Sequence, residues 1–176
     1  NTFATPYLQN PLALGADVSI QAATKYIVGH ADAMLGTVTA NARAAKFIDD
    51  AKERLGTCPG SEETYLGLRG LRTLAVRLQQ HQRSGIAVAE WLAARAEVDR
   101  VLHPALPNDP GHAIWKRDFT GACGLFSIVL KPVPQKALAA FLDGLKLFGM
   151  GYSWGGYESL VVPFDPTSYR TATRWQ

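Results

Sequence analysis

Residues 17–26 have the sequence Asp-Val-Ser-Ile-Gln-Ala-Ala-Thr-Lys-Tyr, in which an apolar stretch typical of a strand ends in a lysine. The small residues Gly29, Ala31 and Gly36 follow soon after. A lysine between an apolar strand and such a turn is expected to be withdrawn from water, which disfavours its charged form and lowers its pKa. That state makes Lys25 a candidate nucleophile of the Schiff-base kind. A structural or solvated lysine remains the alternative on this local pattern alone.

The rest of the first half predicts a short α/β arrangement around this stretch. We expect strands over residues 17–24 and 33–39 and a helix over residues 41–55. Asn41 is a suitable N-cap for this helix, and Gly56 is a suitable C-terminal stop. Two strands and a helix with short connections suit the edge of an α/β sheet.

The second half predicts a smaller α+β unit. A helical pattern starts near Ser61 and continues to Leu92, with Gly85 as a weak point or kink. Such a helix either bridges two domains or represents two packed helices of one core. Short strands over 98–101 and 124–130 and a helix after Pro134 follow. We therefore predict two domains, over residues 1–72 and 73–176.

Composition and charge limit the class of protein. The chain has 176 residues, of which 47% are hydrophobic and 19% charged, as in an ordinary globular protein. The net charge is +3, and the basic residues are interspersed with acidic ones rather than gathered in a stripe. Nucleic-acid binding is therefore not indicated.

Cysteine usage and hydropathy bear on the compartment. Cys58 and Cys123 lie far apart in the sequence and predict reduced thiols rather than a disulfide scaffold. No apolar run is long enough to span a bilayer, so we expect no membrane partner and a cytoplasmic location. The first residues, from Asn1, and the last, to Gln176, resemble cuts through a larger protein, and we expect an internal segment of a longer chain.

A second candidate site lies in the aromatic and glycine-rich segment 152–159. Glycines here could bring the backbone close to a ligand, while the Ser153 hydroxyl and the Trp154 indole N–H could donate to a carboxylate. An aromatic turn that closes a hairpin is the alternative. The four histidines have no metal-ligand spacing, so no metal site is predicted.

Several of these segments together resemble the Cys/Met-metabolism enzymes that depend on pyridoxal phosphate. Residues 17–26 and 29–34 resemble the cofactor-lysine segment of that family, and the likeness covers essentially the whole chain. It continues through residues 70–74, 103–107, 115–121 and 153–159. The resemblance implies an α/β fold, with part of the large domain of a fold-type I pyridoxal-phosphate transferase and a smaller C-terminal α+β domain.

Two positions favour one branch of the family. Most members have a serine three residues before the lysine, whereas Ala22 stands here, as in the β-lyases. Trp154 stands where γ-lyases and γ-synthases usually have leucine. The resemblance thus implies a carbon–sulfur lyase of methionine biosynthesis that cleaves L-cystathionine to homocysteine, pyruvate and ammonia. A γ-lyase-like enzyme remains the alternative.

The resemblance also assigns roles to single residues. Lys25 would form the Schiff base with pyridoxal 5'-phosphate and act as the general base. Thr24 would contact the cofactor phosphate, and Thr2 would pack against the cofactor ring. Ser153 and Trp154 would bind the carboxylate of the amino-acid substrate. The family is typically a homotetramer, a dimer of dimers.

Other functional groups of the family have no counterpart in this sequence. These are the aspartate that pairs with the pyridine nitrogen, the glycine loop for the phosphate, the ring-stacking tyrosine and the substrate-carboxylate arginine. We therefore expect the isolated chain to be inactive. A non-catalytic interaction module is the rival hypothesis.

Overall fold

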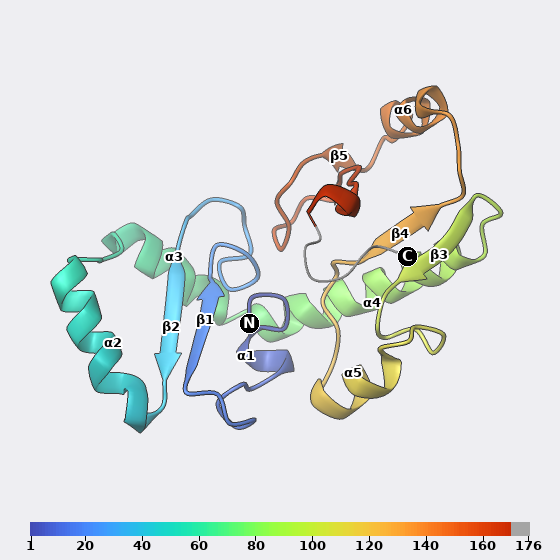
Figure 1. Cartoon of the computed structure of the whole chain (residues 1–176). Coiled ribbons are helices and arrows are strands. Elements are labelled where there is room, and N and C mark those ends of the chain that lie inside the picture. The colour runs from blue at the N-terminus through green and yellow to red at the C-terminus, as the bar shows by residue number, and fades with distance from the viewer. Residues whose placement is uncertain (170–176) are drawn as a thin grey trace.

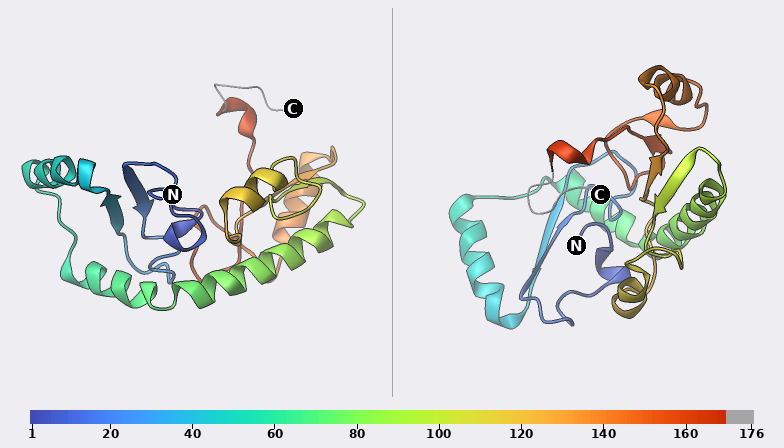
Figure 2. Two further views of the ribbon diagram at one scale, coloured as in Figure 1. Left: turned by 90° about the horizontal axis from the view of Figure 1, so that it is seen from below. Right: turned by 45° about the vertical axis from the view of Figure 1, so that its right-hand side comes forward.

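One long helix organises the molecule. The computed structural model describes residues 1–169, and the end of the predicted second domain, residues 170–176, lies outside this part. Helix α4 (Leu74–Ala93) runs along one side of most other elements (Figures 1 and 2). Helix α1 (Thr5–Leu8) and the first sheet lie near its beginning, and the second sheet lies near its end.

The first sheet pairs the two strands expected around the lysine segment. Strand β1 (Val18–Ala22) runs antiparallel to β2 (Gly36–Ala40). Both are shorter than or displaced from the predicted ranges, because the chain turns sharply at residue 23. The amide of Lys25 donates to the Ala22 carbonyl at 3.1 Å. Lys25 therefore lies in the turn after β1 and not at the end of the strand.

Helix α2 (Ala42–Leu55) confirms both predicted caps. The Asn41 side chain accepts from the Ala44 amide at 3.1 Å, and Gly56 adopts a left-handed φ of 63°. The side-chain amide of Asn41 also donates to the carboxylate of Asp17 at 2.7 Å. Hydrogen bonds from Arg43 and then Asn41 hold the pKa of Asp17 below its usual value. This polar cluster joins the start of α2 to the start of β1.

The predicted long helix is in fact two helices, and the break does not occur at Gly85. Helix α3 (Ser61–Leu71) ends before α4 begins. A side chain at Gly70 would collide with the carbonyls of residues 27 and 28, so the loop after Lys25 packs directly on the end of α3. Gly85 remains helical and buried, and a Cβ there would lie 3.3 Å from the Gly124 Cα. Its role is close packing, not bending.

The second half contains the predicted strands in shorter form. Strand β3 (Val98–Leu102) runs antiparallel to β4 (Ser127–Leu130), with a register irregularity near Arg100. The predicted strand at 124–130 starts only at Ser127, and Gly124 before it packs against the His81 side chain. The remaining elements are α5 (His112–Asp118), α6 (Gln135–Asp143), the parallel pair β5 (Gly149–Met150) and β6 (Leu160–Val161), and the short helix η1 (Pro166–Ser168).

The core connects helix α4 to the turn after β1, residues 23–29, which we call the lysine turn. Its buried members come from α1, the turn after β1 and the first half of α4, and they are Ala4, Leu8, Tyr26, Leu74 and Leu78. Phe119, Cys123 and Trp154 pack against this cluster. Because α4 contributes to this core and also lies against β3, the boundary at residue 72 stays a prediction. No helix within residues 1–169 is long and apolar enough to cross a membrane.

Candidate functional site

Lys25 projects from the turn that follows β1. The Gly29 amide donates to the Lys25 carbonyl at 2.8 Å, which closes the turn around the lysine. The residue is half-buried, and its Nζ donates a hydrogen bond in a solvent-exposed position. The predicted withdrawal from water is therefore only partial, because the turn places the side chain at the surface of the core rather than inside it. An incoming small molecule can reach this amine.

Ser153 is brought to Lys25 across 128 positions of sequence. The Lys25 Nζ donates to the Ser153 Oγ at 3.1 Å. Gly155, with φ of 82°, allows this approach, because a Cβ there would lie 3.0 Å from the backbone of Lys25 and Tyr26. The segment between β5 and β6 thus lies directly against the lysine turn. The two candidate sites of the sequence form one site.

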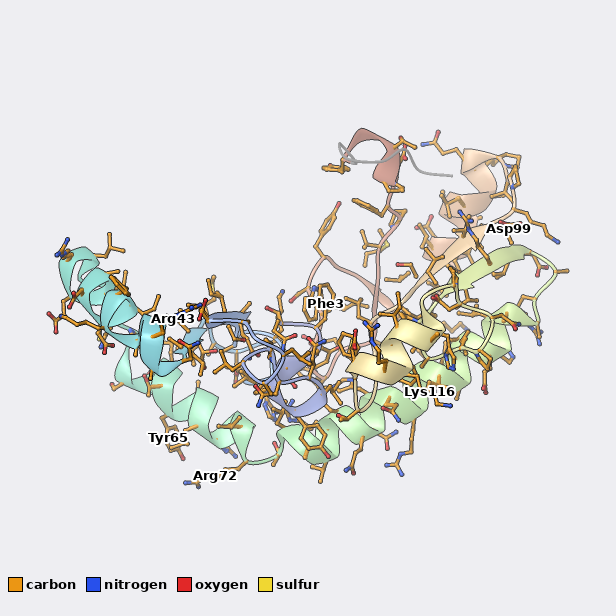
Figure 3. The ribbon with its side chains drawn as sticks, turned by 60° about the horizontal axis from the view of Figure 1, so that its bottom comes forward. Phe3, Arg43, Tyr65, Arg72, Asp99 and Lys116 are labelled. Atoms are coloured by element: carbon orange, nitrogen blue, oxygen red, sulfur yellow. The ribbon has the colours of Figure 1, made fainter. Side chains whose placement is uncertain are left out.

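Trp154 packs beside the lysine. Its ring stacks on Phe3 with centroids 4.7 Å apart and an interplanar angle of 8°, and it is tilted to Tyr26 at 5.5 Å. The Lys25 Nζ lies 5.2 Å from the Trp154 ring centroid, within cation–π range. Figure 3 places Phe3 in the middle of the molecule. In this conformation Trp154 contacts the lysine amine with the face of its ring.

Thr24 and Thr2 are both engaged with the backbone. The Thr24 hydroxyl accepts from the Leu35 amide at 2.9 Å and donates to the Leu35 carbonyl at 3.2 Å. A hydroxyl has one proton, so a bond to a phosphate would replace the bond to that carbonyl. The Thr2 hydroxyl accepts from the Ala22 amide at 2.9 Å, which fixes Thr2 beside the end of β1. Their cofactor roles stay predictions.

Tyr26 is an aromatic residue of the site that sequence reasoning did not select. It is 2% exposed, and burial raises the pKa of its hydroxyl, with Cys123 next in effect. Its ring contacts His81 edge-on at 5.3 Å. Burial, and then the charge of Arg77, lower the pKa of His81. Both shifts favour the neutral side chains, so the neutral phenol of Tyr26 packs against the neutral imidazole of His81. The adjacency to Lys25 was the only signal for Tyr26, and Phe3 had none.

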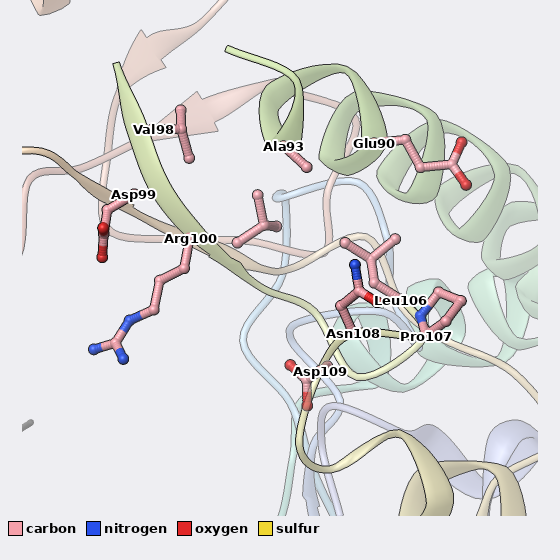
Figure 4. A pocket seen from close by; sticks show the side chains of 10 residues that line it. Glu90, Ala93, Val98, Asp99, Arg100, Leu106, Pro107, Asn108 and Asp109 are labelled. Atoms are coloured by element: carbon pink, nitrogen blue, oxygen red, sulfur yellow. The ribbon is translucent and has the colours of Figure 1, made fainter. Parts of the chain in front are cut away.

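A pocket lies away from these residues. It has a volume of about 430 Å³ and opens between the end of α4, β3 and the loop after it (Figure 4). Its lining includes Glu90, Asp99, Leu106 and Asp109 but none of the predicted site residues. Within residues 1–169, no group of three or more histidine, cysteine or acidic side chains could hold a metal ion. This pocket and the residues around Lys25 are therefore separate sites.

The residues around Lys25 fit part of a pyridoxal phosphate site. Lys25 supplies an accessible amine with a polar partner, as a Schiff-base lysine needs. Thr24 precedes Lys25 in the sequence, Thr2 bonds to the backbone at Ala22, and both threonines carry a hydroxyl group. The donor set therefore suits the aldehyde side of such a cofactor.

Comparisons with known proteins identify the family of the chain. The family model described as "Cys/Met metabolism PLP-dependent enzyme" matches residues 1–174. Cystathionine beta-lyase MetC of Escherichia coli (strain K12) is 53% identical over 167 residues, covering 94% of this chain and 42% of that protein. Human cystathionine gamma-lyase is 43% identical over 165 residues, with 92% and 40% covered.

Solved structures give the same result for the fold. Cystathionine gamma synthase from Xanthomonas oryzae pv. oryzae superposes with a TM-score of 0.85 at 40% identity, covering 90% of this chain and 41% of that one. Its fold-type I architecture agrees with the predicted α/β class. The chain spans about two fifths of the length of these relatives. It belongs to the Cys/Met-metabolism family of enzymes, whose cofactor is pyridoxal phosphate.

Proposed function

We propose that this chain forms the lysine-bearing part of a carbon–sulfur lyase that cleaves L-cystathionine by β-elimination. The observation that carries the proposal is the contact between Lys25 and Ser153, from two segments that both resemble the β-lyase branch. The higher identity to a cystathionine beta-lyase than to a cystathionine gamma-lyase supports the same choice. The overall reaction consumes one water and yields homocysteine, pyruvate and ammonia.

The cofactor supplies the electronic part of this chemistry. When bound, pyridoxal phosphate would provide an aldehyde that reacts with the amine of Lys25 or of the substrate. Its ring would accept the electron pair left at the substrate α-carbon. Once the substrate amine has displaced it, the free Lys25 Nζ would take the α-proton as general base. The same Nζ then returns a proton to the sulfur that leaves the β-carbon. The Ser153 oxygen, which accepts from Nζ, orients the amine for both transfers.

The product identity decides between the two lyase hypotheses. The full-length protein is incubated with L-cystathionine, and the 2-oxo acid is identified by mass spectrometry. A β-elimination gives pyruvate and homocysteine, whereas a γ-elimination gives 2-oxobutyrate and cysteine. We expect pyruvate from the wild-type protein and none from Lys25→Ala. Lys46→Ala, which removes an exposed lysine of α2, is the matched control and should retain activity.

The rival class, a non-catalytic interaction module, makes a different prediction in the same experiment. It predicts no imine absorbance on addition of pyridoxal phosphate and no 2-oxo acid of either kind. Release of 2-oxobutyrate alone would replace the β-lyase proposal with the γ-lyase alternative.

We also propose a cytoplasmic homotetramer as the working form. Both cysteines of the described residues are free, which suits a reducing compartment. Large apolar side chains are exposed on α2 and α3, including Phe47, Leu55 and Leu68. Such surfaces usually mark contacts with other parts of an assembly. Light scattering on the full-length protein measures the number of subunits directly.

A further inference from the structure

Arg77 directs its guanidinium at backbone carbonyls of the lysine turn. Its Nη1 donates to the Tyr26 carbonyl at 2.7 Å, and its Nη2 donates to the carbonyls of Ile27 at 3.2 Å and Gly70 at 2.7 Å. The Nε donates to the Thr73 hydroxyl at 3.1 Å. None of the ion pairs found within residues 1–169 includes Arg77.

These acceptors belong to two different segments. Tyr26 and Ile27 follow Lys25 directly, while Gly70 lies in the last turn of α3. A cation is favoured at the C-terminal end of a helix, where carbonyl oxygens are unpaired. The guanidinium therefore ties the lysine turn to the junction of α3 and α4.

Two glycines leave the space that this contact needs. Gly29 has φ of 75°, and a Cβ there would overlap the Arg77 guanidinium. At Gly70, a Cβ would overlap the carbonyls that follow Tyr26. An arginine fork can reach several carbonyls at fixed angles, whereas a lysine ammonium is a single point donor. The site is thus built for a guanidinium and not only for a positive charge.

The other contacts of the turn with α4 are made by Tyr26, which belongs to the core with Leu74 and Leu78 and contacts His81 edge-on. The amides of Lys25, Val28 and Gly29 donate to carbonyls within the same segment, and Thr24 bonds to Leu35, so these hydrogen bonds do not reach α4. The Lys25 Nζ must meet Ser153, which a separate segment holds. The position of the turn relative to the helices decides whether this 3.1 Å contact forms.

We propose that Arg77 is a positioning residue for Lys25, which acts by clamping the backbone after the lysine onto the α3–α4 junction. The role of Lys25 rests on the proposed function. Arg77 touches neither substrate nor cofactor in this proposal, and its effect reaches the reaction through the lysine.

The first test uses hydrogen exchange on the full-length protein without cofactor. Arg77→Lys keeps the charge, and Arg77→Gln removes it. We expect exchange in the peptide covering residues 24–29 to rise about tenfold or more in Arg77→Gln and less in Arg77→Lys, since hydrogen bonds to a charged donor are lost. Peptides from β3 should exchange as in the wild type. Arg83→Lys, an exposed arginine on the same helix, is the control.

The second test measures the lysine itself. Full-length protein is incubated with pyridoxal phosphate and reduced with borohydride, and the modified Lys25 peptide is quantified. We expect trapping about tenfold slower in Arg77→Gln, together with a lower kcat and an unchanged KM. Thr73→Val removes one anchor of the guanidinium and should give a smaller change in the same direction. If Arg77→Gln does not fold, the trapping rate of Thr73→Val decides whether Arg77 positions Lys25.

The outcomes separate this proposal from the proposed function. Wild-type protein that is not trapped at Lys25 refutes the proposed function. Trapping in the wild type with unchanged rates in all Arg77 and Thr73 variants refutes the role of Arg77 alone. Exchange that rises equally in every peptide also overturns it, because Arg77 would then contribute only general stability.

Discussion

At the scale of single residues, Ser153 has two possible roles that kinetics can separate. It accepts a hydrogen bond from Lys25, and the sequence resemblance assigns it to the substrate carboxylate. An orienting partner of the base acts on the chemical step, whereas a substrate contact acts on binding. The geometry favours the first role.

We predict that Ser153→Ala in the full-length protein lowers kcat about tenfold, the loss expected for one hydrogen bond to a charged group. KM for L-cystathionine should stay within about twofold on the same argument. Ser159→Ala, an exposed serine of the same segment, is the control. A raised KM with an unchanged kcat would instead assign Ser153 to substrate binding.

Gly155 offers a second residue-scale prediction. Gly155→Ala adds left-handed strain of roughly 1–2 kcal/mol and also pushes a Cβ against the Lys25 backbone. Gly15 has φ of 96°, but no atom lies within 4 Å of the place that its Cβ would take, so Gly15→Ala carries the strain alone. Both variants should lose thermal stability, and only Gly155→Ala should lose lyase activity. Equal activities would contradict the close approach.

At the scale of elements, α4 depends on its contact with the lysine turn. Leu78 is 1% exposed and belongs to the core that includes Tyr26. We predict that Leu78→Ala costs about 2–5 kcal/mol, since it leaves a cavity in the core. Val76→Ala, on the exposed face of the same helix, is the control for helix propensity. Urea unfolding followed by circular dichroism measures both, and equal losses would place Leu78 outside the core.

The stability of the loop from His103 to His112 is expected to depend on pH. His103 is 2% exposed, its Nδ1 accepts from the Ala105 amide, and its buried Nε2 has no partner among the described residues. Burial is the main cause that lowers the pKa of His103. The unfolded loop therefore binds protons more readily than the folded loop, and the stability of the loop decreases as the pH is lowered.

We expect full stability of this loop above about pH 6.5, the ordinary pKa of histidine, with a loss as the pH falls from there towards the lowered value. Hydrogen exchange of residues 103–112, corrected for the intrinsic rate, measures the local opening. His103→Gln should reduce the dependence, and the exposed His30→Gln should not. An opening free energy that rises on acidification would refute the assignment.

At the scale of the whole molecule, the described residues do not complete a sheet. β1 and β2 pair only with each other, and Ile20 and Val38, which face each other across the pair, are 66% and 50% exposed. A two-stranded sheet is marginally stable alone, and its open edges favour association. The relatives contain more than twice as many residues as this chain covers.

We predict that the isolated 176-residue chain releases no pyruvate from L-cystathionine and elutes as aggregates in size-exclusion chromatography. The full-length protein under the same conditions is the control. A monodisperse isolated chain that releases pyruvate would contradict the prediction, because these residues would then suffice for the reaction.

The sequence alone determined the local features that depend on neighbouring residues. The caps at Asn41 and Gly56, the strand before Lys25 and the family resemblance were all readable, because capping and strand patterning act over a few positions. The division into two helices was one of two alternatives, and the position of the break was not readable, since it lies where a distant loop packs on Gly70.

Only the tertiary structure decided the environment of Lys25. The contacts with Ser153, Trp154 and Phe3, and the Arg77 clamp, join segments far apart in the chain, and no local pattern encodes such contacts. Lys25 is half-buried rather than withdrawn from water for the same reason, because its exposure depends on which distant side chains pack around it.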